Sequence, residues 1–137
     1  MLFRSRRSAE QGNRDAQHAL GTYYEIGKGV PKDLHFAFAW YKAAAEQGDP
    51  RSLRNLGNFY LEGIVVSRDY NRAAQLFREA ADRGNLRALK NLGYMYYFGA
   101  GVTRDLAKAQ ELFRQSAATD EASAQFALGT QIGRAHV

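Results

Sequence analysis

The sequence of 137 residues has no cysteine, only two prolines and no long apolar run. Without cysteine the chain cannot form disulfides, a thiolate metal site or a thiol nucleophile, and a cytoplasmic and a periplasmic location both stay open. No apolar stretch approaches the roughly 18 residues of a membrane-spanning helix, so we expect no membrane insertion. The formal net charge is +5, and because basic and acidic residues are interspersed, we expect no nucleic-acid binding.

The most regular feature of the sequence is a Leu-Gly pair that recurs every 36 residues along the chain. A tyrosine stands three positions after the glycine in the first three copies, and Ile132 stands there in the fourth. A repeat length between about 20 and 50 residues is typical of solenoid proteins. We assign a structural role to the recurring residues, which are Leu20, Gly21, Tyr24, Leu56, Gly57, Tyr60, Leu92, Gly93, Tyr96, Leu128 and Gly129.

Each repeat predicts a pair of helices. In the first repeat, apolar residues at helical spacing run from about Asp15 to Ile26, and a glycine-rich loop then leads to a second helix that ends near Gln47. An aspartate directly before each second helix can accept hydrogen bonds from its free N–H groups. The predicted helix caps are Asp33, Asp69 and Asp105.

Three complete helix pairs are expected, between the tail of an earlier helix at 6–12 and the start of a later one. We place the repeats at about 13–48, 49–84 and 85–120, with a partial fourth helix at 121–131. One loop departs from the pattern, because Val65 stands where the other two loops have Gly29 and Gly101. We expect this loop to be stiffer or differently shaped.

The two ends of the chain do not fit the repeat. Residues 1–5 and 132–137 match translations of the two strands of a common sequencing adapter, so we expect both to be foreign scars around an array at 6–131. Natural but divergent ends are the alternative. The first repeat then has an incomplete upstream neighbour. We therefore expect Leu20 to be less enclosed than Leu92.

The three copies together carry a family resemblance. The pattern Ala-x-x-x-Leu-Gly-x-x-Tyr-x-x-Gly, then Gly-Val-x-[Lys/Arg]-Asp, then Ala-x-x-[Trp/Leu]-[Tyr/Phe]-x-x-Ala-Ala-x-x-Gly resembles the Sel-one-like repeat, a variant of the tetratricopeptide repeat. The resemblance implies an all-α, right-handed superhelical solenoid of antiparallel helix pairs, often found in bacterial proteins. It also implies a scaffold that binds other proteins and no single shared reaction. We expect a non-catalytic protein without a cofactor.

We expect no catalytic or metal site. The glycine-rich loops lack the phosphate-binding pattern, and the three histidines, His18, His35 and His136, have neither a partner at i+4 nor clustered carboxylates. We expect the recurring aromatic residues to pack in the core: Tyr24, Tyr60, Tyr96, Trp40, Phe77 and Phe113. The competing interpretation is a hydrolase acting on cell-wall or beta-lactam substrates, an activity associated with some cysteine-rich relatives. The absence of cysteine argues against it.

Positions that change between repeats indicate where a partner binds. In the resembling superhelix the first helix of each repeat lines the concave surface, and its outward positions here are Asp15, His18, Thr22 and Glu25 in repeat one and mainly basic or aromatic in the others. Four cations in the second and third repeats form a basic strip able to pair with carboxylates of an acidic peptide or protein. A solvated basic face without a ligand is the alternative. The candidate partner-binding residues are Arg51, Arg54, Asn58, Arg87, Lys90, Tyr94 and Tyr97, and Leu61 is a further outward position.

Overall fold

The computed structural model describes the backbone of residues 2–128 and the side chains of residue 2 and residues 4–118. Within these residues the chain forms helices and no strand. The helices are α1 (Leu2–Glu10), α2 (Arg14–Ile26), α3 (Leu34–Glu46), α4 (Pro50–Glu62), α5 (Tyr70–Asp82), α6 (Leu86–Phe98) and α7 (Leu106–Leu128). The predicted all-α fold is confirmed.

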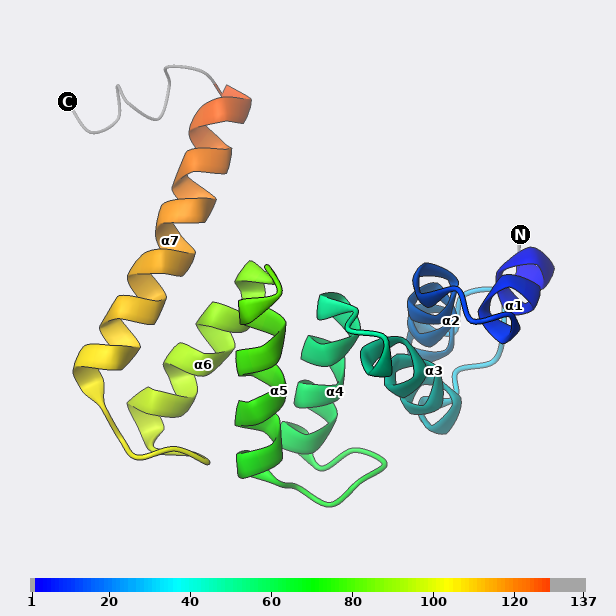
Figure 1. Cartoon of the computed structure of the whole chain (residues 1–137), viewed down its shortest axis with the longest axis horizontal. Helices are drawn as coiled ribbons and strands as arrows, with labels where there is room; N and C mark the ends of the chain where they lie inside the picture. The colour runs from blue at the N-terminus through cyan, green and yellow to red at the C-terminus, as the bar shows by residue number, and fades with distance from the viewer. Residues whose placement is uncertain (1, 129–137) are drawn as a thin grey trace.

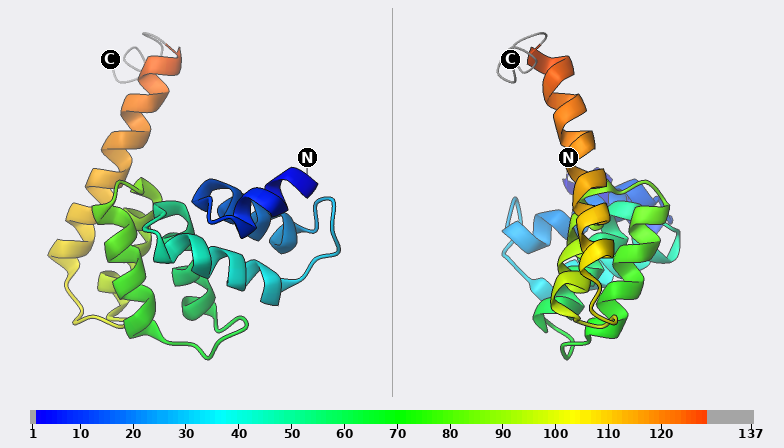
Figure 2. Two further views of the ribbon diagram at one scale, coloured as in Figure 1. Left: turned by 45° about the vertical axis from the view of Figure 1, so that its right-hand side comes forward. Right: turned by 90° about the vertical axis from the view of Figure 1, so that its left-hand side faces the viewer.

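The helices pack as consecutive pairs, with α2 against α3, α4 against α5 and α6 against α7 (Figure 1). Packing of α3 on α4 and of α5 on α6 joins each pair to the next. Figure 2 shows the pairs following one another along a curved path, with α7 extending away from the other helices. The chain is therefore a solenoid of helix pairs that repeats every 36 residues, as predicted.

Short polar side chains begin the helices. Asp33 Oδ1 accepts hydrogen bonds from the backbone N–H groups of His35 and Phe36, and Asp69 and Asp105 accept one each at the start of α5 and α7. The three predicted caps are confirmed. The first helices have caps that the sequence analysis did not identify: Asn13, Asp49 and Asn85.

In the three Leu-Gly pairs that the structure describes in full, the glycine lets an aromatic ring of the second helix lie on the backbone of the first. A Cβ atom added to Gly57 would lie 2.6 Å from Cε1 of Phe77, and one added to Gly93 would lie 2.6 Å from Cε1 of Phe113. Gly21 and Tyr41 make the same contact in the first repeat. Because any side chain would displace the ring, this contact explains why glycine recurs here.

The predicted aromatic core is confirmed in part. Phe77 and Tyr24 are buried, whereas Trp40, Tyr60, Tyr96 and Phe113 are half-buried at the edge of the core. The expectation that Leu20 is less enclosed than Leu92 is wrong, since Leu20 is 0% exposed and Leu92 is 4% exposed. The physical reason is that α1 packs against α2 and covers the first repeat.

The loop that contains Val65 keeps the shape of the other two, so the expectation of a different shape is wrong. Val65 has φ 68°, against 76° for Gly29 and 72° for Gly101. The ends of the loop are fixed by the Asp69 N–H, which donates to the Tyr60 carbonyl at 2.9 Å, as the equivalent groups do in the other repeats. A β-branched residue in this left-handed conformation costs roughly 1–2 kcal/mol, so the second loop is strained.

The predicted break near residue 120 is absent, because α7 continues as one helix of 23 residues to Leu128. In the first two repeats the second helix ends at Glu46 or Asp82, and Gly48 or Gly84, both of which have positive φ, follows two residues later. The third repeat has Asp120 at this position and Glu121 in place of the capping Asp or Asn. Without the stop signal and the new cap, the helix continues.

The ends of the chain add little to this picture. Residues 2–5 lie in the first turn of α1, whereas Met1 and residues 129–137, including Gly129, lie outside the described residues. The foreign origin of the two ends therefore stays a prediction. None of the described helices combines the length and the apolar character needed to cross a bilayer.

Candidate functional site

The first helices of all three repeats contribute to one pocket of about 460 Å³. Residues of α2, α4 and α6 all line it, so the pocket spans the first helices of three successive repeats. We call it the polar pocket, and its lining residues are His18, Thr22, Glu25, Tyr41, Arg51, Arg54, Asn55, Asn85 and Arg87. It therefore includes three of the seven candidate residues, Arg51, Arg54 and Arg87.

Arg51 is not the free cation that the predicted basic strip required. Its Nη2 donates to Asp15 Oδ1 at 2.6 Å, and its Nε donates to Asp49 Oδ1 at 3.1 Å. The Asp49 side chain is almost fully buried and also accepts a hydrogen bond from the Ser52 hydroxyl. Arg51 and Asp15 occupy equivalent positions of adjacent repeats, so the expectation that residues 36 apart are neighbours is confirmed for this pair. The two carboxylates largely neutralise the positive charge of Arg51.

Arg54 has no such partner. It is half-buried, and its guanidinium forms no hydrogen bond or ion pair with any described residue. Burial, and then the positive charge of Arg87, lower the pKa of Arg54, while Glu25 acts in the opposite direction more weakly. The folded protein therefore holds a partly desolvated cation next to a second cation, which is an arrangement that a bound anion would stabilise.

Glu25 gives the pocket a carboxylate that the candidate residue set did not include. The Tyr41 hydroxyl donates to Glu25 Oε1 at 2.6 Å, and it lies 3.2 Å from the Thr22 hydroxyl. Burial, followed by the hydrogen bond to Glu25, raises the pKa of Tyr41 well above its usual value. The phenol therefore stays protonated and holds the Glu25 side chain in place.

His18 also lines the polar pocket, where it lies beside Asn55 and Tyr41. One of its ring nitrogens is 3.3 Å from Asn55 Nδ2, and its ring centroid is 5.6 Å from that of Tyr41. Burial, and then the positive charge of Arg51, lower the pKa of His18 despite the opposing carboxylates Asp49 and Asp15. No group of three or more histidine and carboxylate side chains among the described residues could hold a metal ion.

The other four candidate residues lie outside the polar pocket. Tyr94 lines a second, mainly apolar pocket of about 360 Å³ between α4 and α6, together with Leu61 and Phe98. Tyr97 is exposed and packs against Phe98, with 4.9 Å between the ring centroids. Asn58 and Lys90 line neither pocket. The structure thus divides the predicted set between a polar pocket, an apolar pocket and the exposed helix surface.

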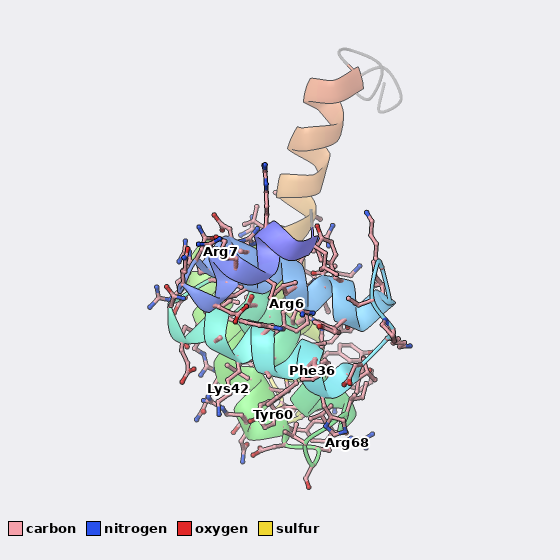
Figure 3. The ribbon with its side chains drawn as sticks, turned by 90° about the vertical axis from the view of Figure 1, so that its right-hand side faces the viewer. Arg6, Arg7, Phe36, Lys42, Tyr60 and Arg68 are labelled. Atoms are coloured by element: carbon pink, nitrogen blue, oxygen red, sulfur yellow. The ribbon has the colours of Figure 1, made fainter. Side chains whose placement is uncertain are left out.

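A third pocket, of about 710 Å³, lies between α1, α2 and α3, where we predicted no binding residue from the sequence. We call it the outer pocket; Arg6 of α1 and Phe36 of α3 line it and are visible on one side of the molecule in Figure 3. An alignment of the repeats does show a difference at the positions that line this pocket. Where the second repeat has Arg72, Gln75 and Glu79, the first has Phe36, Ala39 and Ala43, all of which line this pocket.

Comparisons with known proteins agree with the repeat pattern. The family model for the Sel1 repeat matches residues 14–49, 50–85 and 86–118. Among solved structures, c5321, a protective antigen of uropathogenic Escherichia coli strains with an SLR fold, has a TM-score of 0.81 and 41% identity. That match covers 93% of this chain but only 27% of the length of c5321.

Two further solved structures are similar over most of their length. A Sel1 repeat protein from Oxalobacter formigenes has a TM-score of 0.77 and 32% identity, and the match covers 86% of this chain and 89% of that one. Helicobacter pylori cysteine rich protein B has a TM-score of 0.65 at 21% identity, over 85% of this chain and 89% of that one, and so supports the fold alone. The search of curated proteins returned no match.

Proposed function

The chain belongs to the Sel1 repeat family, whose members typically act as scaffolds for protein interactions, and from this premise we propose that its polar pocket binds an acidic peptide segment of a partner protein. The proposal rests on the environment of Arg54. It is a half-buried guanidinium with no ion-pair partner among the described residues, and Arg87 lowers its pKa further. A carboxylate placed between the two guanidinium groups would remove this repulsion and form charge-assisted hydrogen bonds.

The chemistry of arginine suits such a ligand. Its planar guanidinium offers several N–H donors in a fixed fork that matches the two oxygens of a carboxylate. The pocket is also long enough to meet three repeats, which favours an extended segment over a small ion. The repeat array holds Arg54 and Arg87 on separate helices, so their spacing is set by the stacking of the second repeat on the third.

Nothing in the polar pocket favours the competing hydrolase function. The Tyr41 hydroxyl donates to Glu25, the Thr22 hydroxyl lies next to it, and the His18 ring contacts Asn55, so no hydroxyl there is paired with a histidine base. Hydrolysis of nitrocefin or of peptidoglycan by the protein above a buffer control would support the enzyme instead.

The test uses a fluorescein-labelled octapeptide of alternating Asp and Gly and measures its binding by fluorescence anisotropy. We expect saturable binding that weakens as the salt concentration rises. The double variant Arg54→Gln/Arg87→Gln should weaken it by roughly tenfold or more, since a hydrogen bond to a charged group contributes about 1.5–3 kcal/mol.

A matched control separates the pocket from general charge attraction. The double variant Lys42→Gln/Arg72→Gln removes the same amount of positive charge from exposed positions on α3 and α5 that do not line the polar pocket. The control should bind the octapeptide like the unmodified protein. Equal weakening in both double variants, or no binding by the unmodified protein, would contradict the proposal.

A further inference from the structure

Glu25 is the only carboxylate among the residues that line the polar pocket. One of its oxygens accepts the Tyr41 hydroxyl at 2.6 Å, and it forms no ion pair with any described residue. Tyr41 is itself fixed, because the residue is 1% exposed and its ring lies against Gly21. The second Glu25 oxygen is therefore held in a set position and remains available to a ligand.

The charges in the pocket change sign along the solenoid. Glu25 lies on α2, Arg54 on α4 and Arg87 on α6, and all three line the same cavity. Arg51 is compensated by Asp15 and Asp49, so it adds little to this pattern. The residues equivalent to Glu25 in the later repeats are Leu61 and Tyr97, which are uncharged. Only the first repeat offers a carboxylate at this position.

The opposite charges attract one another but remain apart. The charge of Glu25 raises the pKa of Arg54, but this effect is smaller than the opposing effects of burial and of Arg87. No ion pair within 4.0 Å joins the Glu25 and Arg54 side chains. A ligand with a single sign of charge cannot satisfy both. A wholly acidic segment would pair with the arginines but would place some of its charge near Glu25, and like charges brought together in an interface are unfavourable.

We infer that the polar pocket selects a partner segment with both signs of charge, with a carboxylate bound by Arg54 and Arg87 and a lysine or arginine side chain bound by Glu25. This inference rests on the proposed function and specifies the chemistry of the partner. Glu25 is then the residue that determines specificity: it accepts a cationic group at the α2 side of the pocket and disfavours a segment that is acidic throughout.

The experiment compares labelled octapeptides in the same anisotropy assay. The reference is the alternating Asp-Gly peptide, and in the test peptides either the first or the last Asp is replaced by Lys, with matching Gln peptides as controls for the lost acid. We expect one Lys peptide to bind roughly tenfold more tightly than its Gln counterpart, because one charged hydrogen bond is gained. Testing both ends covers both chain directions in the groove.

Variants connect the selectivity to Glu25. Glu25→Gln should remove the preference for Lys over Gln and should bind the wholly acidic reference peptide more tightly than the unmodified protein does. Glu62→Gln removes the same charge at an exposed position at the end of α4 that does not line the polar pocket, and it should retain the preference.

The two proposals fail in different ways. If no octapeptide binds, the proposed function is wrong and the inference fails with it. If the acidic reference binds through Arg54 and Arg87 but neither Lys peptide binds more tightly than its Gln counterpart, only the inference is wrong. A preference for Lys that persists in Glu25→Gln would also overturn the inference.

Discussion

The contact between the two helices of a pair and the lining of the polar pocket follow opposite rules. Each helix pair has a glycine beneath an aromatic ring, at Gly21, Gly57 and Gly93. In the pocket, by contrast, the position of Glu25 becomes Leu61 and then Tyr97 in the later repeats. The comparison indicates that the glycine–aromatic contact holds every helix pair together, whereas Glu25 gives the first repeat a charge that the later repeats lack at the same position. Substitutions in the two regions should therefore have separable effects.

The largest effect is expected for Gly57→Ala. On an open helix surface this change would stabilise the protein by roughly 1 kcal/mol through helix propensity. Here the new Cβ would lie 2.6 Å from Cε1 of Phe77, whose side chain is fully buried, so we expect a net loss of about 1–3 kcal/mol in the free energy of unfolding. Urea unfolding followed by circular dichroism measures it.

A double-mutant cycle with Phe77→Leu identifies the cause of that loss. The smaller side chain should make room for the methyl group, so Gly57→Ala should cost less in the Phe77→Leu background than alone. If the two changes are additive, the ring is not what requires glycine at this position.

The strained loop predicts a smaller effect in the opposite direction. Val65→Gly should stabilise the protein by roughly 0.5–1 kcal/mol, because relief of the left-handed strain exceeds the added flexibility of the unfolded chain. Gly29→Val is the reciprocal change, at a position with φ 76° and open space for a side chain, and it should cost a similar amount. A destabilised Val65→Gly variant would show that the valine side chain contributes packing that outweighs the strain.

His18 predicts a weak dependence of stability on pH. Because its folded pKa lies below the ordinary value of 6.5, the unfolded chain takes up the proton first as the pH falls. The contribution of neutral His18 to the free energy of unfolding is therefore complete above pH 6.5. It is lost as the pH falls through the lowered pKa of the folded state. Unfolding free energies measured between pH 8 and pH 5 should decline less in His18→Gln than in the unmodified protein.

The control for this experiment is His35→Gln, because His35 is exposed on α3. It should show the same decline with pH as the unmodified protein. If His18→Gln declines as steeply as His35→Gln, the burial of His18 has no measurable consequence for stability.

Arg54→Gln should have the smallest effect on stability, and it should not be a loss. The folded state disfavours the charge of Arg54 through burial and through Arg87, so its removal should leave the free energy of unfolding equal or slightly higher. Lys42→Gln, which removes an exposed positive charge, is the control. A clear drop in the thermal unfolding temperature of Arg54→Gln relative to this control would mean that Arg54 stabilises the fold and is not reserved for ligand binding.

The helix pairs, the second-helix caps and the 36-residue register could be predicted because they depend on short-range patterns in the sequence. The pairing of Arg51 with Asp15 could have been read from that register, since the two positions are equivalent. The lack of a partner for Arg54 depends on side-chain geometry that no spacing encodes. The shape of the Val65 loop could not be predicted from the sequence, because the hydrogen bonds at the loop ends outweigh the conformational preference of valine.

The most direct test maps the alternating Asp-Gly octapeptide onto ¹⁵N-labelled protein by changes in amide chemical shift. We expect the largest changes on α2 and α4 around Glu25 and Arg54 and on the start of α6 around Arg87. The amides of Phe36 and Ala39, which line the outer pocket, should stay unchanged. Changes centred on the outer pocket, or spread evenly over the basic residues of the surface, would show that the acidic peptide does not bind in the polar pocket.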